Sequence, residues 1–206
     1  MAPDAPKSDE LTPEDSVLIR ETLKWMQETF GETVLASTDN DWTYIVKLHA
    51  MIETALNDVL TKHFQAPDLG RVIAKLDTSN PGTGKVAFAK ALKILAPQTA
   101  VFIQKLSELR NLCVHDIRNF KFDLDKYLTS LSKEKRSELM KPILKMVRPE
   151  MRDKLPLQGA LYIGTMSVMI ELFLHHYKIE TRALESKLHR LESELYKRAE
   201  STATKE

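Results

Sequence analysis

The stretch of residues 97–120 carries its apolar side chains at steps of three and four residues. An α-helix has 3.6 residues per turn, so side chains at these steps line up along one face. The stripe consists of Leu106, Leu109, Cys113, Ile117 and Phe120. The pattern predicts an α-helix over residues 97–120 with one buried face.

The same kind of pattern extends over most of the chain. Only six of the 206 residues are glycine, and long stretches are rich in Leu, Lys, Glu and Ala, which favours an almost entirely helical protein. Further helices are predicted over residues 12–31, 42–64, 67–76, 85–95, 123–131 and 132–147. In the second of these, the side chains predicted to face inward are Ile45, Leu48, Ile52, Leu56 and Val59. We predict an all-α fold, an up-and-down helical bundle with a long C-terminal helix.

The C-terminal part begins with the most hydrophobic run of the chain, residues 157–174. A run of about 18 apolar residues is long enough to consider a membrane span. Gln158, Glu171 and two glycines argue against one, so we expect no membrane and a helix buried in a bundle or half in a dimer interface. After residue 177, leucines recur at steps of four, three and four. Two heptads are too few to predict a coiled coil, but they predict an amphipathic helix that packs on a partner or on its own bundle.

The chain is expected to divide into a disordered tail (residues 1–10), a helical bundle (11–177) and a C-terminal amphipathic helix with a tail (178–206). The first ten residues lack the apolar core of a signal peptide. One cysteine cannot form an internal disulfide, so nothing indicates an oxidising compartment. These features favour a cytoplasmic protein.

Charge gives one local signal. The formal net charge of +1 exerts no general attraction on nucleic acid, so any such contact requires a local patch. Residues 132–156 hold eight basic residues against four acids. This segment is either a solvated helix face and loop or a surface for RNA or DNA. Its candidate RNA-binding residues are Lys141, Lys145, Arg148 and Arg152.

Two other patterns invite a ligand-binding interpretation. Gly82-Thr83-Gly84-Lys85 resembles the end of a phosphate-binding loop, but Ser79 replaces the first glycine and Val86 the final Ser or Thr, so we reject that reading. His49 and Glu53 lie one helical turn apart. Without further ligands at suitable spacing they predict a polar pair, so no metal or other cofactor is expected.

A cation, an amide and an imidazole lie close together on the helix predicted over residues 97–120. Asn111 and His115 are four residues apart and share the side away from the apolar stripe. Arg110 lies on the flank, about 140° from His115 around the helix. Cys113 belongs to the apolar stripe and is expected to be a small core residue rather than a nucleophile.

The Arg110-Asn111-x-x-x-His115 pattern resembles the signature of the HEPN superfamily of α-helical domains. The resemblance extends to the preceding long helix with His49 and Glu53 and to the short Leu69-Gly70-Arg71 helix. The order of these features is similar to that of the mannitol operon repressor-like branch, and the resemblance covers roughly residues 42–123.

In HEPN ribonucleases, the resemblance would make His115 the acid or base, Arg110 the phosphate ligand and Asn111 a residue that orients them. The chemistry agrees, because RNA carries its own nucleophile and a histidine can move protons near neutral pH. A guanidinium offers two parallel N–H groups to a phosphate, so no metal is needed. One histidine supplies only one proton transfer, and the resemblance implies a homodimer that supplies two.

Two functions remain open from the sequence. The first is a HEPN-type RNA-binding protein or metal-independent endoribonuclease, a toxin or defence component with an antitoxin or regulatory protein partner. The second is a non-enzymatic regulatory protein that works through protein–protein contacts, with the C-terminal helix as its functional surface. In a purely structural reading of the motif, His115 ends its helix and Arg110 pairs with an acid such as Glu53.

Overall fold

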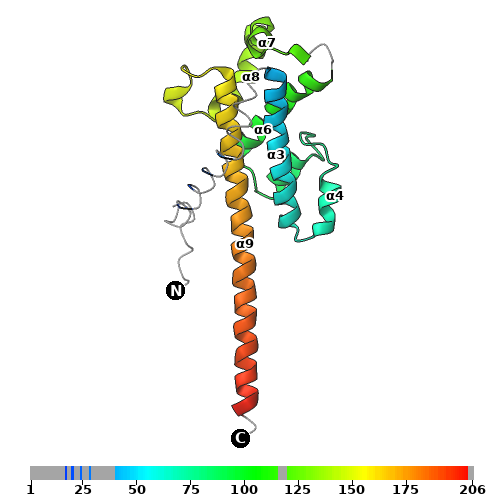
Figure 1. The fold of residues 1–206 in the computed structure, drawn as a ribbon, viewed down its shortest axis with the longest axis vertical. Helices are drawn as coiled ribbons and strands as arrows, with labels where there is room; N and C mark the ends of the chain where they lie inside the picture. Colours follow the sequence, from blue (N-terminus) through cyan, green and yellow to red (C-terminus); the bar gives the residue numbers. More distant parts are fainter. Residues whose placement is uncertain are drawn as a thin grey trace.

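The structure is a computed structural model that describes residues 40–115 and 120–203, with side chains up to residue 193, and four isolated positions nearer the N-terminus. Over these ranges the chain is all-α and carries no strand (Figure 1), which confirms the predicted fold class and the long C-terminal helix. The α-helices are α3 (Asp41–His63), α4 (Gly70–Ile73), α5 (Lys85–Ala91), α6 (Pro97–Val114), α7 (Leu124–Ser130), α8 (Lys133–Lys145) and α9 (Leu157–Ala203). Two 3₁₀ turns, Pro67–Leu69 and Pro149–Met151, lie between them.

Helix α3 lies at the centre of the bundle and contacts α6, α9 and the short helices α4 and α5. It starts where the side chain of Asn40 accepts a hydrogen bond from the backbone N–H of Trp42 at 2.8 Å, a typical N-cap. All five side chains predicted to face inward are buried, and the predicted bounds are within one residue of those observed. Local periodicity was therefore sufficient to predict this helix.

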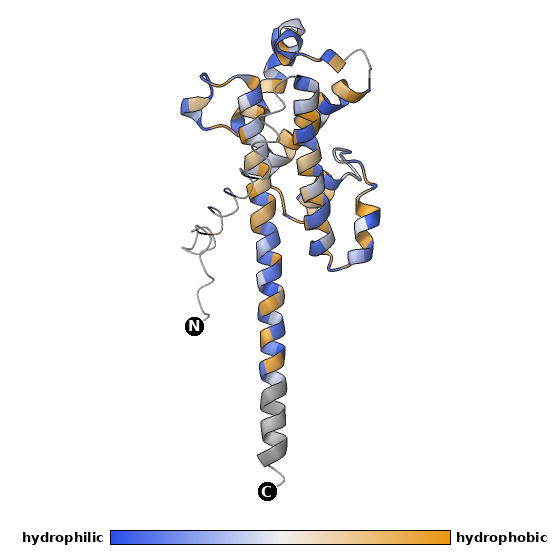
Figure 2. Ribbon diagram, viewed as in Figure 1, coloured by the Kyte–Doolittle hydropathy of each residue, from blue (hydrophilic) through white to orange (hydrophobic). Residues whose placement is uncertain are grey.

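Helix α9 is one uninterrupted helix of 47 residues, about 70 Å long. Its first part packs against α3, α6, α7 and α8, and Leu161, Val168 and Leu172 are buried there. Its last part extends beyond the rest of the bundle (Figure 1) and shows alternating polar and apolar residues (Figure 2). The boundary predicted between residues 177 and 178 falls inside this helix.

The apolar part of α9 also bears on the membrane question. By length and composition alone, Leu157–Ser193 is apolar enough to cross a membrane, a test that core helices of soluble proteins also pass. The first acid of this segment, Glu171, accepts a hydrogen bond from the backbone N–H of Ala96 at 2.5 Å. Ala96 precedes α6 and provides no side-chain cap, so a carboxylate from α9 caps that helix. The absence of a membrane stays a prediction.

Helix α6 ends at Val114, six residues earlier than predicted, and His115 is its C-cap. The indole N–H of Trp42 donates to the carbonyl of Cys113 at 2.7 Å and so satisfies one of the last carbonyls of the helix. Phe120 lies against the ring of Trp42, with centroids 5.4 Å apart, and its side chain is 59% exposed. The prediction was right for Leu106, Leu109 and Cys113, which are buried, and wrong for Phe120. Ile117 lies outside the described residues.

Helix α5 also ends earlier than predicted, at Ala91 rather than at residue 95. Lys93 adopts a left-handed conformation with φ of 56°, and the N–H of Ile94 donates to the carbonyl of Ala89 at 2.8 Å. This is the Schellman arrangement that terminates helices. The helix predicted over residues 67–76 is a 3₁₀ turn followed by α4.

The two helices predicted after residue 122 correspond to α7 and α8, which begin at side-chain caps from Asp123 and Ser132. The tail predicted over residues 1–10 lies outside the described residues, and so does the helix predicted over 12–31 except for the four isolated positions.

Helices α6 and α9 approach closely where Gly164 faces the buried ring of Phe102. A Cβ atom at residue 164 would overlap that ring, whereas a Cβ at Gly159 would meet only the side chains of Leu155 and Pro156 at 3.2 Å or more. We expect Gly164→Ala to lower the free energy of unfolding by about 1–3 kcal/mol, measured by urea denaturation, because the core is overpacked.

Gly159→Ala is the matched control. This substitution gains the same helix propensity of about 1 kcal/mol, but its Cβ does not overlap an aromatic ring. We expect it to leave the free energy of unfolding unchanged or to raise it. Equal stability of the two variants would contradict close packing between α6 and α9.

Candidate functional site

The three residues of the Arg-Asn-His motif lie at the C-terminal end of α6. Arg110 and Asn111 are half-buried in the last turn, and His115 is exposed at the C-cap. The Nη1 of Arg110 donates to the Oδ1 of Asn111 at 3.1 Å. Helical spacing puts Asn111 between Arg110 and His115, so this bond turns the guanidinium toward the side that carries the imidazole.

The N-terminal end of α3 anchors the chain around His115. The hydrogen bond from Trp42 to the carbonyl of Cys113 holds the last turn of α6. Asn40 donates to the carbonyl of Phe120 at 2.7 Å, and Asp41 accepts from the N–H of Leu124 at 2.7 Å. These three consecutive residues therefore bind both the last turn of α6 and the chain at residues 120–124. No pattern in the sequence predicts this role.

A polar cluster formed by side chains of α3, α5 and α6 lies next to Arg110 of the motif. The Nε2 of His49 and the Oγ of Ser107 are 3.1 Å apart, and the Nδ1 of His49 is 3.8 Å from the Oε2 of Glu53. The Oε1 of Glu53 accepts from the Nζ of Lys85 at 2.6 Å, and Lys85 is completely buried. From the sequence, Arg110 was considered as the partner of a second-helix acid such as Glu53. In the described part of the chain the ion-pair partner of Glu53 is Lys85, and no contact joins Glu53 to Arg110. Among the described residues, no group of three potential ligands could hold a metal ion.

The loop before Lys85 does not resemble a phosphate cradle. The Oδ1 of Asp77 accepts from the N–H groups of Ser79 and Asn80, and the Oδ1 of Asn80 accepts from those of Gly82 and Thr83. The loop thus bonds its own backbone N–H groups, and the lysine points inward. A Cβ at Gly84 would lie 2.6 Å from the backbone of Asn80, which explains the glycine at that position.

The protonation states follow from burial. Burial lowers the pKa of His49 below 6.5, the neighbouring Arg110 and Lys85 lower it further, and Glu53 opposes them. His49 is therefore neutral at pH 7. Burial raises the pKa of the Cys113 thiol to about 11, which keeps it protonated and unreactive, as its position on the apolar stripe predicted.

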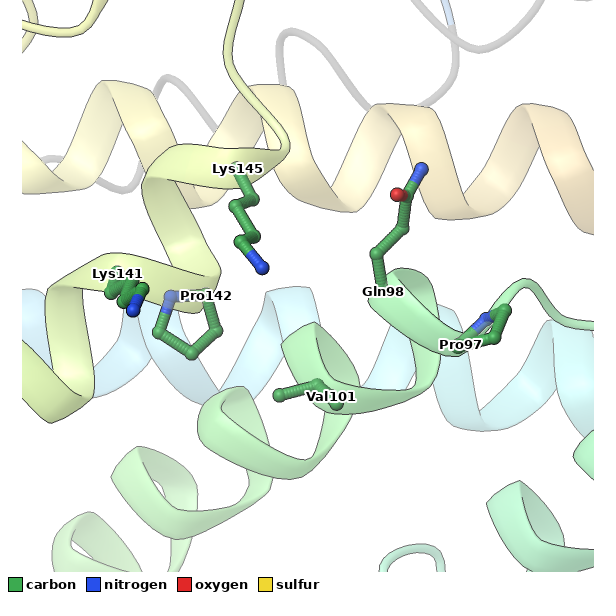
Figure 3. Close-up of a pocket in the computed structure, with 6 residues that line it drawn as sticks. All are labelled: Pro97, Gln98, Val101, Lys141, Pro142 and Lys145. Carbon is green, nitrogen blue, oxygen red and sulfur yellow. The ribbon is translucent and has the colours of Figure 1, made fainter.

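Two of the four basic residues predicted to bind RNA, Lys141 and Lys145, lie apart from the motif. Lys141 and Lys145 line a hollow of about 430 Å³ beside the first turn of α6 (Figure 3). Val101, which also lines it, is ten residues and about 15 Å along the helix from Asn111. Arg148 pairs with Glu150 at 3.6 Å, and Arg152 donates to the carbonyl of Val147 at 3.0 Å. Lys141 and Lys145 therefore lie beside the opposite end of α6 from the motif.

The structure has a larger hollow that the sequence analysis missed. It has a volume of about 990 Å³ and lies where α9 passes the ends of α3 and α5; we call it the α9 groove. Five of its lining residues are Lys or Arg, two are His and none is acidic. The sequence gives little indication of this groove, because its lining residues come from three segments that are far apart in the sequence. These are His63 and Gln65, Leu92 and Lys93, and a face of α9 from His175 to Arg190.

Comparison with known proteins yields no match to a family model, a curated protein or a solved structure. The class of the protein therefore rests on the all-α fold and on the chemistry of its sites. The HEPN resemblance of residues 42–123 stays a prediction.

The ion pair of Lys85 and Glu53 can be tested by removing one partner at a time. Glu53→Gln leaves a buried ammonium without its carboxylate, so we expect a loss of about 3 kcal/mol in the free energy of unfolding. Lys85→Met should cost less, because Glu53 is one-third exposed and can be hydrated. The double variant should be more stable than Glu53→Gln alone. If the double variant loses the sum of the two single losses, the groups are not coupled in the folded protein.

The buried imidazole of His49 predicts that the stability of the fold depends on pH. The folded-state pKa of His49 is lowered, so the unfolded chain binds more protons once the pH falls below about 6.5. We expect the free energy of unfolding to decrease from pH 7 to pH 5, with His49 contributing at most about 1.4 kcal/mol per pH unit. The pKa of His175 is also lowered and contributes in the same direction. Denaturation of His49→Gln should show a shallower decrease; an unchanged pH profile would contradict the neutral, buried imidazole.

Proposed function

We propose that the protein is a metal-independent endoribonuclease of the HEPN type, with Arg110, Asn111 and His115 as its catalytic residues. The observation that carries the proposal is the hydrogen bond from Arg110 to Asn111 at 3.1 Å. It directs the cation toward the side of α6 on which the exposed His115 lies. A phosphate ligand and a proton-transfer group are thus available at one helix end.

The proposed reaction uses the 2′-hydroxyl of RNA as the nucleophile. A neutral imidazole removes the proton from this hydroxyl, whose oxygen attacks the adjacent phosphorus and forms a 2′,3′-cyclic phosphate. The bond from phosphorus to the 5′-oxygen breaks, and a protonated imidazole gives that oxygen a proton. The guanidinium of Arg110 stabilises the negative charge on the phosphoryl oxygens. Two copies of His115 in a two-fold homodimer supply the base and the acid.

A second candidate function is regulation through protein–protein contacts, as the mannitol operon repressor-like resemblance implies. The observation that favours it is the leucine stripe on the projecting part of α9, where the exposed fractions are 68% for Leu184, 59% for Leu188 and 48% for Leu191. Exposed apolar stripes of this kind serve as partner surfaces. In this function no nuclease activity is expected.

The experiment is incubation of the purified protein with a labelled RNA in EDTA. The wild type is expected to produce fragments with 2′,3′-cyclic phosphate ends. His115→Ala should reduce the rate by about 10²–10⁴-fold, the usual contribution of one acid–base group. Arg110→Ala should reduce it by a similar factor.

His189→Ala is the matched control, because His189 is an exposed histidine on α9 that lines neither the motif nor the α9 groove. It should cleave at the wild-type rate. Absence of cleavage by folded wild type, or equal rates for the wild type and His115→Ala, would overturn the nuclease proposal and leave regulation as the better candidate.

A further inference from the structure

We propose that the α9 groove binds the phosphodiester backbone of a single-stranded nucleic acid, independently of the Arg-Asn-His motif. The groove alone indicates a single-stranded nucleic acid; that this nucleic acid is RNA rests on the proposed function. The charge and shape of the groove apply equally to a single-stranded DNA backbone, which shares the phosphodiester chemistry.

Charge provides the first argument. Lys178, Arg182 and Arg190 lie along one face of α9 at steps of four and eight residues, and Lys93 faces them from the end of α5. The acids of the same part of α9 are absent from the lining. One of them, Glu180, is bound to Lys62 at 3.1 Å and to His176 at 2.9 Å. The groove therefore keeps its positive charge for an external anion.

The electrostatics at the inner end of the groove also indicate a concentration of positive charge. The pKa of His175 is lowered by burial and by the neighbouring His63, Lys178 and Arg182. Positive charge is thus concentrated where α9 leaves the bundle. A bound phosphate would offset this repulsion.

Shape and ring contacts favour a nucleic acid over an acidic protein segment. The lining residues of α9 span from His175 to Arg190, about 22 Å of helix, which is enough for several nucleotides. At one end the rings of His63 and His175 stack with centroids 5.7 Å apart, and Phe64, 40% exposed, meets His63 edge-on at 5.8 Å. A cationic channel beside flat rings is the combination that binds single strands, because phosphates pair with the cations and bases stack on the rings.

Backbone conformation provides an independent argument. In the described ranges of the chain, the only non-glycine residues with positive φ are Gln65 (50°) and Lys93 (56°), and both line the α9 groove. Each follows the end of a helix, where glycine is the least strained residue. At both positions the chain keeps a long polar side chain where glycine would be less strained, and that side chain lines the groove.

The test measures binding of fluorescent 20-nucleotide single-stranded RNA and DNA by anisotropy over a range of salt concentrations. RNA is measured with the His115→Ala background so that cleavage does not interfere. The groove variant combines Lys178→Gln, Arg182→Gln and Arg190→Gln. Losing three phosphate contacts should reduce the slope of log K against log salt by about 2 and the affinity by about 50-fold at 0.15 M salt.

The matched control combines Lys133→Gln, Lys135→Gln and Arg136→Gln, three exposed residues of α8 with the same total charge. It should bind like the parent protein. Equal losses in the groove and control variants, or no binding of either oligonucleotide by the folded parent, would overturn the proposal.

A second pair of variants separates binding from folding. Lys93→Gly and Gln65→Gly both remove the left-handed strain and should raise or preserve the melting temperature. Only Lys93→Gly removes a cation, so it should weaken binding about fourfold while Gln65→Gly leaves it unchanged. Equal binding by both variants would count against the groove.

The failures of the two proposals are distinguishable. If the groove variant binds normally while His115→Ala abolishes cleavage, the groove proposal fails and the nuclease proposal stands. If the wild type does not cleave RNA, and the groove variant loses binding while the control variant does not, the nuclease proposal fails and the groove proposal stands.

Discussion

The apolar face of α3 is the surface on which the other helices assemble. Ile45, Leu48, Ile52 and Leu56 have no exposed surface, and α6 and α9 pack against them from two sides. Burial of each such side chain contributes about 1.5–3 kcal/mol, so this face supplies a large share of the stability. Because α6 and α9 are both positioned by α3, it also sets where the motif and the α9 groove lie.

The two candidate sites have different kinds of support. The end of α6 is held by side chains from the start of α3, and a buried polar cluster containing an ion pair lies behind it. The α9 groove instead forms where three chain segments meet at the other end of α3. The first site consists of three polar side chains at one helix end, whereas the second is long and positively charged. In the two proposals, the motif is the reacting centre and the α9 groove is a surface that binds the polymer.

The sequence predicted what depends on neighbouring residues and missed what depends on distant ones. The buried stripe of α3 and the starting positions of α7 and α8 follow from local sequence and were predicted correctly. The end of α6 was placed too late, because the indole of Trp42, 71 residues earlier in the chain, helps to terminate that helix. The α9 groove was missed because, in the sequence, the basic residues of α9 look like those of any solvent-exposed helix face. They form a groove only because the ends of α3 and α5 lie beside them in the fold. The interior position of Lys85 was not foreseen either, because lysines are almost always exposed.

That interior lysine has a chemical consequence. An amine with no exposed surface, held by a carboxylate at 2.6 Å, is out of reach of acylating reagents while the protein is folded. Exposed lysines such as Lys133 and Lys178 react from the native state. Acylation of Lys85 requires α5 and its loop to open first, so its labelling rate reports the frequency of that local opening.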